Sequence, residues 1–363
     1  MPFLPMVKTT QRKVCVVVNS RANYGRIKTV LQSLQLQSSV CLQLIVGASA
    51  LLHRFGNVLK TIEEDGFHID GSVYTIVEGE TPTTMAKSTG LAIIELATMF
   101  ERLKPDIVLT VADRFETLAT AVAASYMNIP LAHTQGGEVT GSIDESVRHA
   151  ITKLAHIHFP ATQLAAENLI RMGEDPTTVH CTGCPAMDIV ARADLNLSPD
   201  IFLRYKGVGP DLDPYKPYLV VLQHPVTTEY GLGMQQIQET IDAISSLRIQ
   251  TVWLWPNVDA GSDDISKALR VFRETHKPSY IHFYKNFPPD DYIKLIANCA
   301  CQIGNSSSAL REGAYLGTPA VNIGSRQNRR QCADNVFHVD YDSVQIQTAI
   351  RSQLLHGRYP TSY

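Results

Sequence analysis

A segment rich in glycine and charged residues contains the side chains best suited to acid–base chemistry. It reads His133-Thr-Gln-Gly-Gly-Glu138-Val-Thr-Gly-Ser-Ile-Asp144-Glu-Ser-Val-Arg148 and continues directly from an apolar run. Asp144 and Arg148 are four residues apart, so on a helix they share a face and could form an ion pair. An arginine lowers the pKa of one carboxyl while burial raises that of its neighbour, which would divide acid and base roles. The alternative interpretation is a helix cap with a surface ion pair, because pairs at this spacing are common.

Two further candidates follow other strand-like runs. Asp113 stands in Val-Ala-Asp-Arg-Phe-Glu, where it could exchange protons, although on its own it is better explained as the N-cap of a helix. His224 stands in Gln-His-Pro-Val-Thr-Thr, where it could bind a phosphate or move a proton. An isolated histidine is more often structural, so this position needs support from its neighbours.

The turn at residues 19–26 is suited to an anion. It reads Asn-Ser-Arg-Ala-Asn-Tyr-Gly-Arg between a strand-like run and a helical pattern. Backbone N–H groups and the helix dipole would face the anion, and Arg21 and Arg26 could add charge-assisted hydrogen bonds. The dinucleotide fingerprint G-x-G-x-x-G is absent, and the alternative is a surface turn with solvated arginines.

A second anion site is predicted at residues 303–312, which read Ile-Gly-Asn-Ser-Ser-Ser-Ala-Leu-Arg-Glu. Ser306, Ser307 and Ser308 offer three hydroxyl donors beside a helix start, which is an arrangement typical of phosphate binding. Glu312 would lie one helical turn into that helix, where it could accept hydrogen bonds from a ribose diol. A serine N-cap accounts for one of these hydroxyls but not for three.

Alternating strands and helices would position these segments. Continuous apolar strands separated by helical patterns such as 85–103 and 115–127 predict an α/β fold with parallel sheets covered on both faces. We predict one doubly wound domain at residues 1–190, on the catalytic and sugar side, and another at 191–363, on the nucleotide side, joined between about 185 and 215. Ligands of such sheets bind at the carboxyl ends of the strands, so the site should lie in the cleft between the domains. The predicted strands are 13–18, 40–46, 106–111, 129–133, 218–222, 250–254, 280–284, 300–303 and 319–323.

Composition excludes several classes of protein. The chain has 363 residues, enough for about two domains, with 44% apolar and 18% charged residues. Its net charge of −3 argues against a nucleic-acid binder with a basic face. No apolar run reaches the roughly 18 residues of a membrane span, and residues 1–8 lack the pattern of a signal peptide. We therefore expect a cytoplasmic protein without nucleic-acid or membrane partners.

Seven cysteines occur, mostly in apolar runs, which predicts reduced core residues. Cys181-Thr-Gly-Cys184 has the spacing of redox and zinc sites, but neither a helix start nor a second pair is evident beside it. There is also no D-x-D pair beside a strand and no Cys/His cluster. We predict no metal and no other cofactor. Together, a pyrophosphate nest in one domain and carboxylates in the other describe an enzyme that handles a nucleotide sugar.

At these residues the chain resembles the hydrolysing UDP-N-acetylglucosamine 2-epimerases of sialic-acid biosynthesis, including the epimerase half of the animal bifunctional enzyme. The resemblance extends in order from about residue 13 to 360. Its most specific motifs are Arg-His-Ala-Ile-Thr-Lys-Leu, within the match at 148–156, and Gln-His-Pro-Val-Thr-Thr at 223–228. Other matches lie at 20–24, 103–107, 113–115, 136–139, 143–144, 255–261, 303–307 and 311–314. The resemblance implies two Rossmann-like domains of the glycosyltransferase-B type with an interdomain cleft.

The resemblance also implies a reaction, in which UDP-GlcNAc and water give ManNAc and UDP. UDP leaves by elimination across C1–C2, and water then adds to the 2-acetamidoglucal with inversion at C2. Carried over by motif, the catalytic candidates are Asp113, Glu138, Asp144, Arg148 and His224, with acid and base roles left open. The candidates for substrate binding are Arg21, Arg26, Gln135, Asn257, Asp259, Phe287, Tyr292, Ser306, Ser307, Ser308, Glu312 and Arg326. Homodimers or homotetramers are usual in the family, which is analogy alone.

Three departures from the family pattern affect these expectations. Gln135 stands where several relatives have a catalytic glutamate, and a neutral amide cannot act as a base. Asn23 replaces an aspartate of the usual Arg-Ala-Asp-Tyr motif, which removes a charge near the phosphates. Relatives continue beyond the position of Tyr363 with a Gly-Asp-Gly turn and a last helix, so we expect weaker closure of the two domains here.

Several alternatives remain open from the sequence. The same chemistry could act on GDP-GlcNAc or on a UDP- or GDP-linked 2,4-diacetamido-trideoxyhexose, as in legionaminic-type pathways. A glycosyltransferase of the same fold would need an acceptor site. A nucleotide-sugar-binding protein without catalysis would bind UDP tightly and show no turnover.

Overall fold

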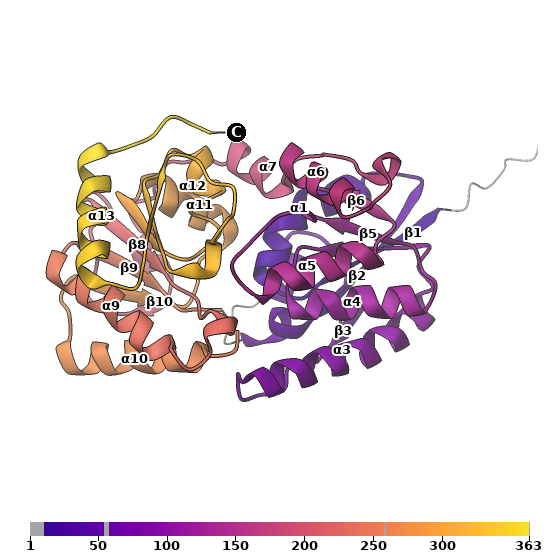
Figure 1. Ribbon diagram of the computed structural model, residues 1–363, viewed down its shortest axis with the longest axis horizontal. Coiled ribbons are helices and arrows are strands. Elements are labelled where there is room, and N and C mark those ends of the chain that lie inside the picture. The colour runs from indigo at the N-terminus through magenta and orange to yellow at the C-terminus, as the bar shows by residue number, and fades with distance from the viewer. Residues whose placement is uncertain (1–10, 54–57, 258, 363) are drawn as a thin grey trace, which may run out of the picture.

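The computed structural model describes residues 11–53, 58–257 and 259–362, which form one parallel and one mostly parallel sheet, each covered by helices (Figure 1). The first sheet has the strand order β3-β2-β1-β4-β5-β6, which is the doubly wound order of dinucleotide-binding folds. All its strand pairs are parallel, for example β1 with β2 and β4. Its strands are β1 (Arg12–Val18), β2 (Val40–Gly47), β3 (Gly71–Val73), β4 (Ile107–Val111), β5 (Leu131–Thr134) and β6 (Ile157–Phe159).

The second sheet has the order β13-β12-β11-β8-β9-β10-β7 and is parallel except for β7, which pairs antiparallel with β10. In Figure 1 the yellow and orange second sheet and the indigo and magenta first sheet form two lobes. Its strands are β7 (Gly207–Val208), β8 (Tyr218–Leu222), β9 (Gln250–Leu254), β10 (Ile281–Tyr284), β11 (Cys301–Gly304), β12 (Ala320–Ile323) and β13 (Val336–Val339).

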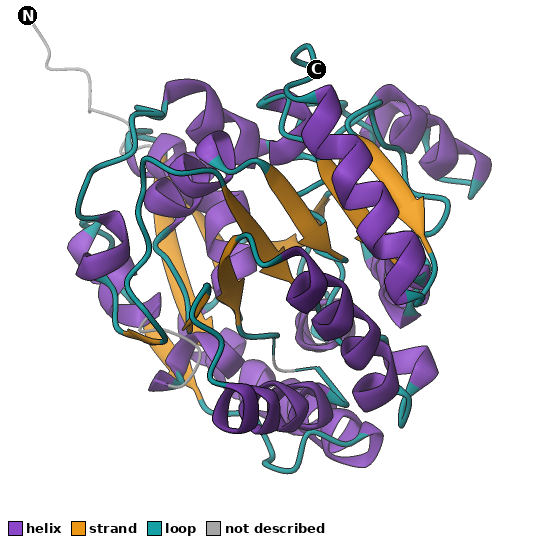
Figure 2. Cartoon of the chain, turned by 90° about the vertical axis from the view of Figure 1, so that its left-hand side faces the viewer, coloured by secondary structure: helices purple, strands orange, loops and turns teal. Residues whose placement is uncertain are grey.

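Helices cover both faces of each sheet (Figure 2). In the first half of the chain these are α1 (Arg21–Gln35), α2 (Val58–Glu64), α3 (Pro82–Leu103), α4 (Phe115–Tyr126), α5 (Ile143–Leu154), α6 (Gln163–Arg171) and α7 (Pro185–Arg192). In the second half they are α8 (Ile201–Arg204), α9 (Gly233–Leu247), α10 (Ser262–His276), α11 (Pro289–Asn298), α12 (Glu312–Tyr315) and α13 (Ser343–His356). Short 3-10 turns lie at Ala48–Leu51, Pro176–Thr178, Thr227–Glu229 and Ser325–Gln327.

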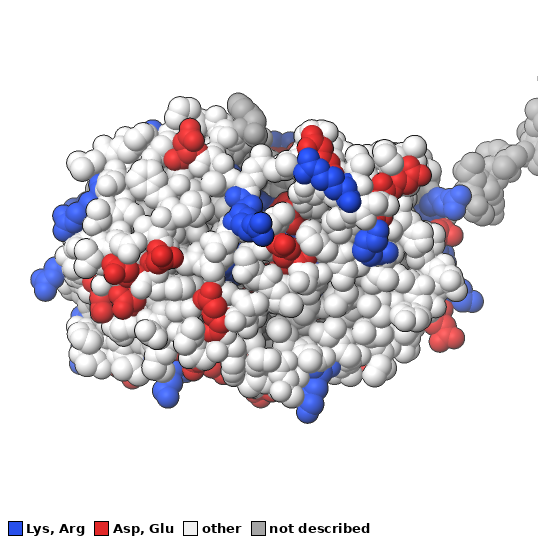
Figure 3. Space-filling model, in the orientation of Figure 1, with Lys and Arg blue, Asp and Glu red and all other residues white. Residues whose placement is uncertain are grey.

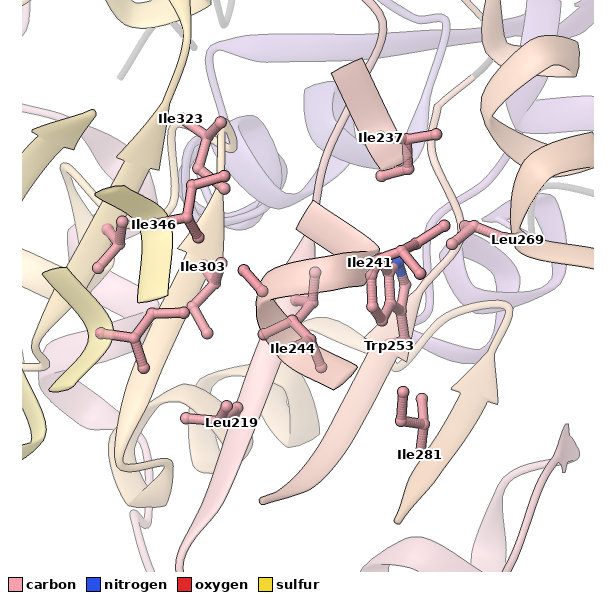
Figure 4. Close-up of a cluster of buried hydrophobic side chains, with 14 of the residues drawn as sticks. Leu219, Ile237, Ile241, Ile244, Trp253, Leu269, Ile281, Ile303, Ile323 and Ile346 are labelled. Carbon is pink, nitrogen blue, oxygen red and sulfur yellow. The ribbon is translucent and has the colours of Figure 1, made fainter. Parts of the chain in front are cut away.

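Buried strands and amphipathic helices explain this architecture. Every residue of β8 is buried, as a strand of a sheet covered on both faces must be. One core cluster joins Leu219, Trp253 and Ile303 of the second sheet to Ile244 of α9 and Ile346 of α13 (Figure 4). The first sheet has separate clusters on its two faces. Among the described residues, no helix has both the length and the apolar character to cross a membrane.

The sequence predicted nine strands within two residues of their observed ends and did not predict β3, β6, β7 and β13. These four strands have only two to four residues each, so they lack the apolar run that marks a central strand. Helix α3 begins at Pro82 rather than at 85, because Thr81 and Thr84 form a capping box before it.

The prediction for the cysteines was only partly correct. Cys15, Cys299 and Cys301 are buried, whereas Cys181 and Cys332 are exposed, and all seven are free thiols. The sequence showed no helix start beside the Cys-x-x-Cys pair, but the structure has one: Cys184 is the N-cap of α7. Its sulfur lies 3.6 Å from the Gln135 amide nitrogen.

Candidate active site

A cavity of about 460 Å³ lies between the two sheets, lined by residues from both halves of the chain. The first half contributes mainly the loop entering α1 and the loop after β4. The second half contributes the segments after β8, β9, β10 and β11. Since these segments follow the carboxyl ends of parallel strands, the cavity lies where doubly wound sheets bind ligands. Among the predicted site residues, those lining it are Arg21, Arg26, Asp113, Asp144, His224, Asn257, Phe287, Tyr292, Ser306, Ser307, Ser308, Glu312 and Arg326.

The charged side chains of the outer face differ from those of the cavity. Figure 3 shows lysines, arginines, aspartates and glutamates of both signs scattered over the visible face, without a broad region of one sign. Among the described residues, the cavity itself is lined by five arginines, Arg21, Arg26, Arg114, Arg270 and Arg326. Such local concentration favours a small anionic ligand over a large anionic surface.

The serine segment after β11 forms the predicted anion nest. The Ser306 and Ser308 hydroxyls lie 3.0 Å apart, and the Tyr292 hydroxyl lies 2.6 Å from that of Ser308. Arg26, from the other half of the chain, donates to the Ser307 hydroxyl at 3.1 Å. Gly304 precedes the nest with a φ of 122°, and a Cβ there would overlap the β8 backbone. Only glycine fits this turn without strain. The glycine at position 304 therefore allows the end of β11 to lie close to the backbone of β8.

Arg21 and Arg326 flank the nest with positive charge. Arg21 donates to the Phe287 carbonyl at 3.0 Å, and Arg326 donates to the Asn305 carbonyl at 3.2 Å. Exclusion of water lowers the pKa of Arg21 to about 10, an effect that Tyr292 partly offsets. The pKa is lowered because few negative groups lie near the Arg21 guanidinium to offset its burial. An anionic ligand would supply that charge.

Glu312 differs from its prediction in position. It is the first residue of α12 rather than one helical turn into it. Burial raises the pKa of its carboxyl, and neighbouring arginines oppose this effect. Its Oε2 atom is enclosed and has no hydrogen-bond partner among the described residues. A carboxylate acceptor at the cavity wall is suited to a diol.

His224 is held in a defined tautomer. Its Nδ1 accepts a hydrogen bond from the backbone N–H of Asn257 at 3.1 Å. Burial lowers its pKa well below the usual value, and Arg326 and Arg114 lower it further. The ring is therefore neutral at pH 7 with its proton on Nε2, from which it can donate to a ligand.

The predicted ion pair between Asp144 and Arg148 does not form. Arg148 is fully buried and instead pairs with Asp113, while its other terminal nitrogen donates to the Glu138 carbonyl at 2.6 Å. The prediction was wrong because i,i+4 spacing permits an ion pair but carries no information about partners from other loops. Here the partner is Asp113, in the loop after β4. Asp113 is also not an N-cap, since Arg114 occupies the cap of α4 and no side chain caps it.

Two of the carboxyls that line the cavity, Asp113 and Asp144, have opposite pKa shifts. Burial would raise the pKa of Asp113, but Arg148 and Arg26 together hold it well below its usual range. Burial and the nearby Asp113 raise the pKa of Asp144 to about 6, and Arg326, at 3.8 Å, opposes them. One carboxyl therefore stays ionised while the other exchanges protons near neutral pH, as acid–base catalysis requires.

Glu138 and Gln135 are not among the residues that line the cavity; they lie behind its wall. Glu138 pairs with both Arg311 and Arg330 across the two halves of the chain. Arg311 also donates to the Gln135 amide oxygen at 2.9 Å. Burial would raise the pKa of Glu138, but Arg311 and Arg330 lower it to about 2.

Replacing Glu138 by glutamine is expected to lower the free energy of unfolding by about 3 kcal/mol at pH 7. The pKa of Glu138 is depressed in the folded chain, so its contribution is complete above its unfolded value near 4.5 and lost as pH falls toward about 2. The difference between variant and parent should therefore shrink below pH 4.5 in urea unfolding. Glu167→Gln removes an exposed pair and should change stability by less than about 0.5 kcal/mol. A pH-independent difference would contradict the assignment.

Sequence reasoning missed the contacts that join the two halves. Arg114 pairs with Asp259 at 2.9 Å and with Glu116 at 2.9 Å, so Asp259 contacts the cavity wall rather than the cavity. Arg311 was noticed only as part of a motif, and Arg330 carried no signal. Both are recognisable only once the fold brings residues about 170 to 190 positions apart together. In the part of the chain that the structure describes, no group of three or more His, Cys, Asp or Glu side chains could hold a metal ion.

Comparison with known proteins identifies similar chains. The family described as UDP-N-acetylglucosamine 2-epimerase matches residues 32–361. A hydrolysing UDP-N,N'-diacetylbacillosamine 2-epimerase of Legionella pneumophila is 35% identical, over 94% of this chain and 89% of that protein. A UDP-N-acetylglucosamine 2-epimerase of Neisseria meningitidis is 27% identical, over 96% of this chain and 89% of that protein.

Several solved structures have a fold similar to that of this chain. A Methanocaldococcus jannaschii UDP-GlcNAc 2-epimerase in complex with UDP-GlcNAc and UDP has a TM-score of 0.78 at 15% identity, covering 97% of this chain and 96% of that chain. A Neisseria meningitidis UDP-GlcNAc 2-epimerase bound to UDP-GlcNAc has a TM-score of 0.75 at 18% identity, covering 95% and 91%. These likenesses confirm the predicted fold of two Rossmann-like domains of the glycosyltransferase-B type.

Proposed function

The chain belongs to the UDP-N-acetylglucosamine 2-epimerase family, and within that family we propose that it is a hydrolysing enzyme that converts UDP-GlcNAc and water into ManNAc and UDP. The observation that carries this proposal is the composition of one cavity. An anion nest at Ser306–Ser308 lies at the same cavity as two carboxyls of opposite pKa shift, Asp113 and Asp144. That combination suits removal of a diphosphate together with proton transfer at the adjacent sugar.

The two halves of the chain divide the work in this proposal. Residues 191–363 hold the nucleotide, with Glu312 accepting from the ribose diol and the nest and Arg326 binding the diphosphate. Arg21 reaches the same diphosphate from the first half of the chain. The Nε2–H of His224 donates to the leaving phosphate oxygen. Residues 1–190 hold the sugar, where Arg148 positions Asp113 through their buried pair. Glu138 and Gln135 act from behind the wall, by holding the two halves together.

The chemistry then follows in two balanced steps. A base removes the C2 proton, its electrons form the C1–C2 double bond, and the C1–O electrons leave with UDP. Water then adds to the glycal, with its oxygen at C1 and a proton at C2 on the opposite face. Asp144, whose pKa is about 6, is suited to exchange one of these protons. Ionised Asp113 stabilises positive charge that develops at C1 when the C1–O bond breaks.

A second sugar is favoured by a specific observation. Identity is greater to the Legionella diacetylbacillosamine enzyme, at 35%, than to the Neisseria UDP-GlcNAc enzyme, at 27%. A Campylobacter jejuni relative, named as a hydrolysing GDP/UDP-N,N'-diacetylbacillosamine 2-epimerase, is 29% identical over 92% of this chain. We therefore include UDP- and GDP-linked N,N'-diacetylbacillosamine as alternative substrates for the same two steps.

The function is tested by proton NMR in heavy water with four donors: UDP-GlcNAc, GDP-GlcNAc, UDP-N,N'-diacetylbacillosamine and GDP-N,N'-diacetylbacillosamine. We expect one donor to yield a free 2-epimerised sugar that carries deuterium at C2, together with the free nucleotide. The accepted donor identifies both nucleotide and sugar. A product that stays linked to the nucleotide would contradict hydrolysis, and turnover only with an added acceptor would indicate a transferase.

A further inference from the structure

Arg326 lies between two positions for negative charge. One of its terminal nitrogens is 3.8 Å from the Asp144 carboxylate, and the other donates to the Asn305 carbonyl at 3.2 Å, directly before the serine nest. Its backbone carbonyl accepts from the Gly141 N–H at 3.1 Å, which fixes the segment against the other half of the chain. The guanidinium can therefore serve either the carboxylate or an anion on the nest while its backbone stays in place.

Charges from four segments act on Asp144. Asp113 and Asp259 favour its protonated form, as burial does, whereas Arg326 and Arg114 favour its ionised form. Arg148, further along the same helix, adds positive charge. Arg114 is already paired with Asp259 and Glu116, and Arg148 with Asp113. Of the cations around Asp144, Arg326 is therefore the one that an anion on the nest can draw away from the Asp144 carboxylate.

We propose that a diphosphate bound on the serine nest takes over Arg326 and thereby strengthens the binding of a proton from solvent by the Asp144 carboxylate. The step consumes only that proton, and the carboxylate becomes a carboxylic acid without any other bond changing. The inference rests on the proposed function, because it assumes that the nest holds the diphosphate of a nucleotide sugar.

The consequence is a catalytic group whose basicity depends on the leaving group. Without ligand, Arg326 keeps Asp144 a weak base, because positive charge at 3.8 Å favours the carboxylate. With the diphosphate seated, loss of that charge and arrival of negative charge both raise its affinity for protons. A proton-transfer group works best when its pKa lies near the working pH. The pKa of Asp144 would then move from about 6 closer to the working pH when a diphosphate is present to leave.

Proton uptake on binding tests this coupling directly. Calorimetric titrations at pH 7 with UDP-glucose and GDP-glucose, each in phosphate and in Tris buffer, give the number of protons taken up per ligand bound. These probes carry no group that titrates between pH 5 and 8. A rise of one unit from about 6 predicts uptake of about 0.4 proton per chain at pH 7.

Three variants locate the proton and the cation. Asp144→Asn should reduce the uptake to near zero, and Arg326→Gln should reduce it by at least half, because the carboxyl then has no cation to lose. Uptake per bound ligand is independent of affinity, so weaker binding does not obscure the comparison. Arg270→Gln is the matched control, since Arg270 lines the same cavity but donates to Ser266 of its own helix. It should leave the uptake unchanged.

Each outcome supports or overturns a stated part. Binding with uptake that disappears in Asp144→Asn and falls by at least half in Arg326→Gln supports the coupling, whereas unchanged uptake in Arg326→Gln overturns the role of Arg326. Binding without uptake overturns the coupling and leaves the proposed function intact. Uptake that persists in Asp144→Asn also overturns it and assigns the proton to another group that lines the cavity, such as His224 or Glu312. Failure of both nucleotides to bind overturns this inference and the proposed function together.

Discussion

Replacing Arg148 by methionine is expected to lower the free energy of unfolding by about 3–5 kcal/mol and turnover by at least about 100-fold. Arg148 is fully buried and pairs with Asp113. Methionine has a similar volume but no charge, so the variant leaves a buried carboxylate and the Glu138 carbonyl without their donor. Removing one partner of a buried pair costs more than the pair itself contributes, because the remaining charge stays away from water.

A double-mutant cycle separates this effect from loss of packing. Asp113→Asn in the Arg148→Met background removes the uncompensated charge, so the double variant should be less destabilised than the sum of the single variants by about 1–3 kcal/mol. Turnover should not recover, because Asp113 itself faces the cavity. Arg171→Met is the matched control, since Arg171 is 70% exposed in its pair with Glu167 and should change stability by less than about 0.5 kcal/mol.

Urea unfolding and initial rates with the donor accepted in the NMR assay measure both effects. Additive single and double variants would mean that the pair does not couple, contrary to its geometry. A stable Arg148→Met variant with normal turnover would contradict the assignment of Asp113 as a residue that Arg148 positions.

The strands that carry the site were predictable because they are central strands. Val14–Val18 and Tyr218–Leu222 are apolar throughout, and only a sheet covered on both faces accepts such runs. The edge strands escaped prediction. Strand β7 is two exposed residues, and β13 exposes two of its four, so neither contains an apolar run or a clean alternation.

Most of the site residues that the sequence predicted line the cavity, but the sequence did not predict which charged side chains form ion pairs with each other. Serines after a strand and before a helix indicate a nest from local sequence alone, and Ser306–Ser308 line the cavity. Ion pairs depend on loops that are distant in sequence, so the local spacing of Asp144 and Arg148 predicted the wrong partner. The double pair of Glu138 with Arg311 and Arg330 illustrates the same limit, because 173 and 192 residues separate the partners.

The largest effect that leaves each domain intact is expected at Gly141. A Cβ at this position would overlap the Ser325 carbonyl oxygen and approach the Asn328 Cβ to 3.0 Å, and both belong to the other half of the chain. Because Ser325 presents backbone rather than a flexible side chain, we expect the two halves to move apart at this contact. The contact lies beside the hydrogen bond from Gly141 to Arg326, which is where the sugar side meets the nucleotide side.

Gly141→Ala should therefore lower turnover by about 100-fold, since a displacement of about 1 Å between reacting groups costs that much. Its free energy of unfolding should change by less than about 1 kcal/mol, because Gly141, Ser325 and Asn328 belong to none of the core clusters of the two sheets. Small-angle X-ray scattering with and without UDP should show a more open chain that closes less on binding. Gly90→Ala provides the matched control, since a Cβ there meets no atom within 4 Å, and alanine inside α3 should stabilise by about 0.5–1 kcal/mol. Normal turnover in Gly141→Ala would mean that catalysis does not require the two halves to meet at this contact. Arg326 and Asp144 would then have to perform the roles proposed for them in a more open site.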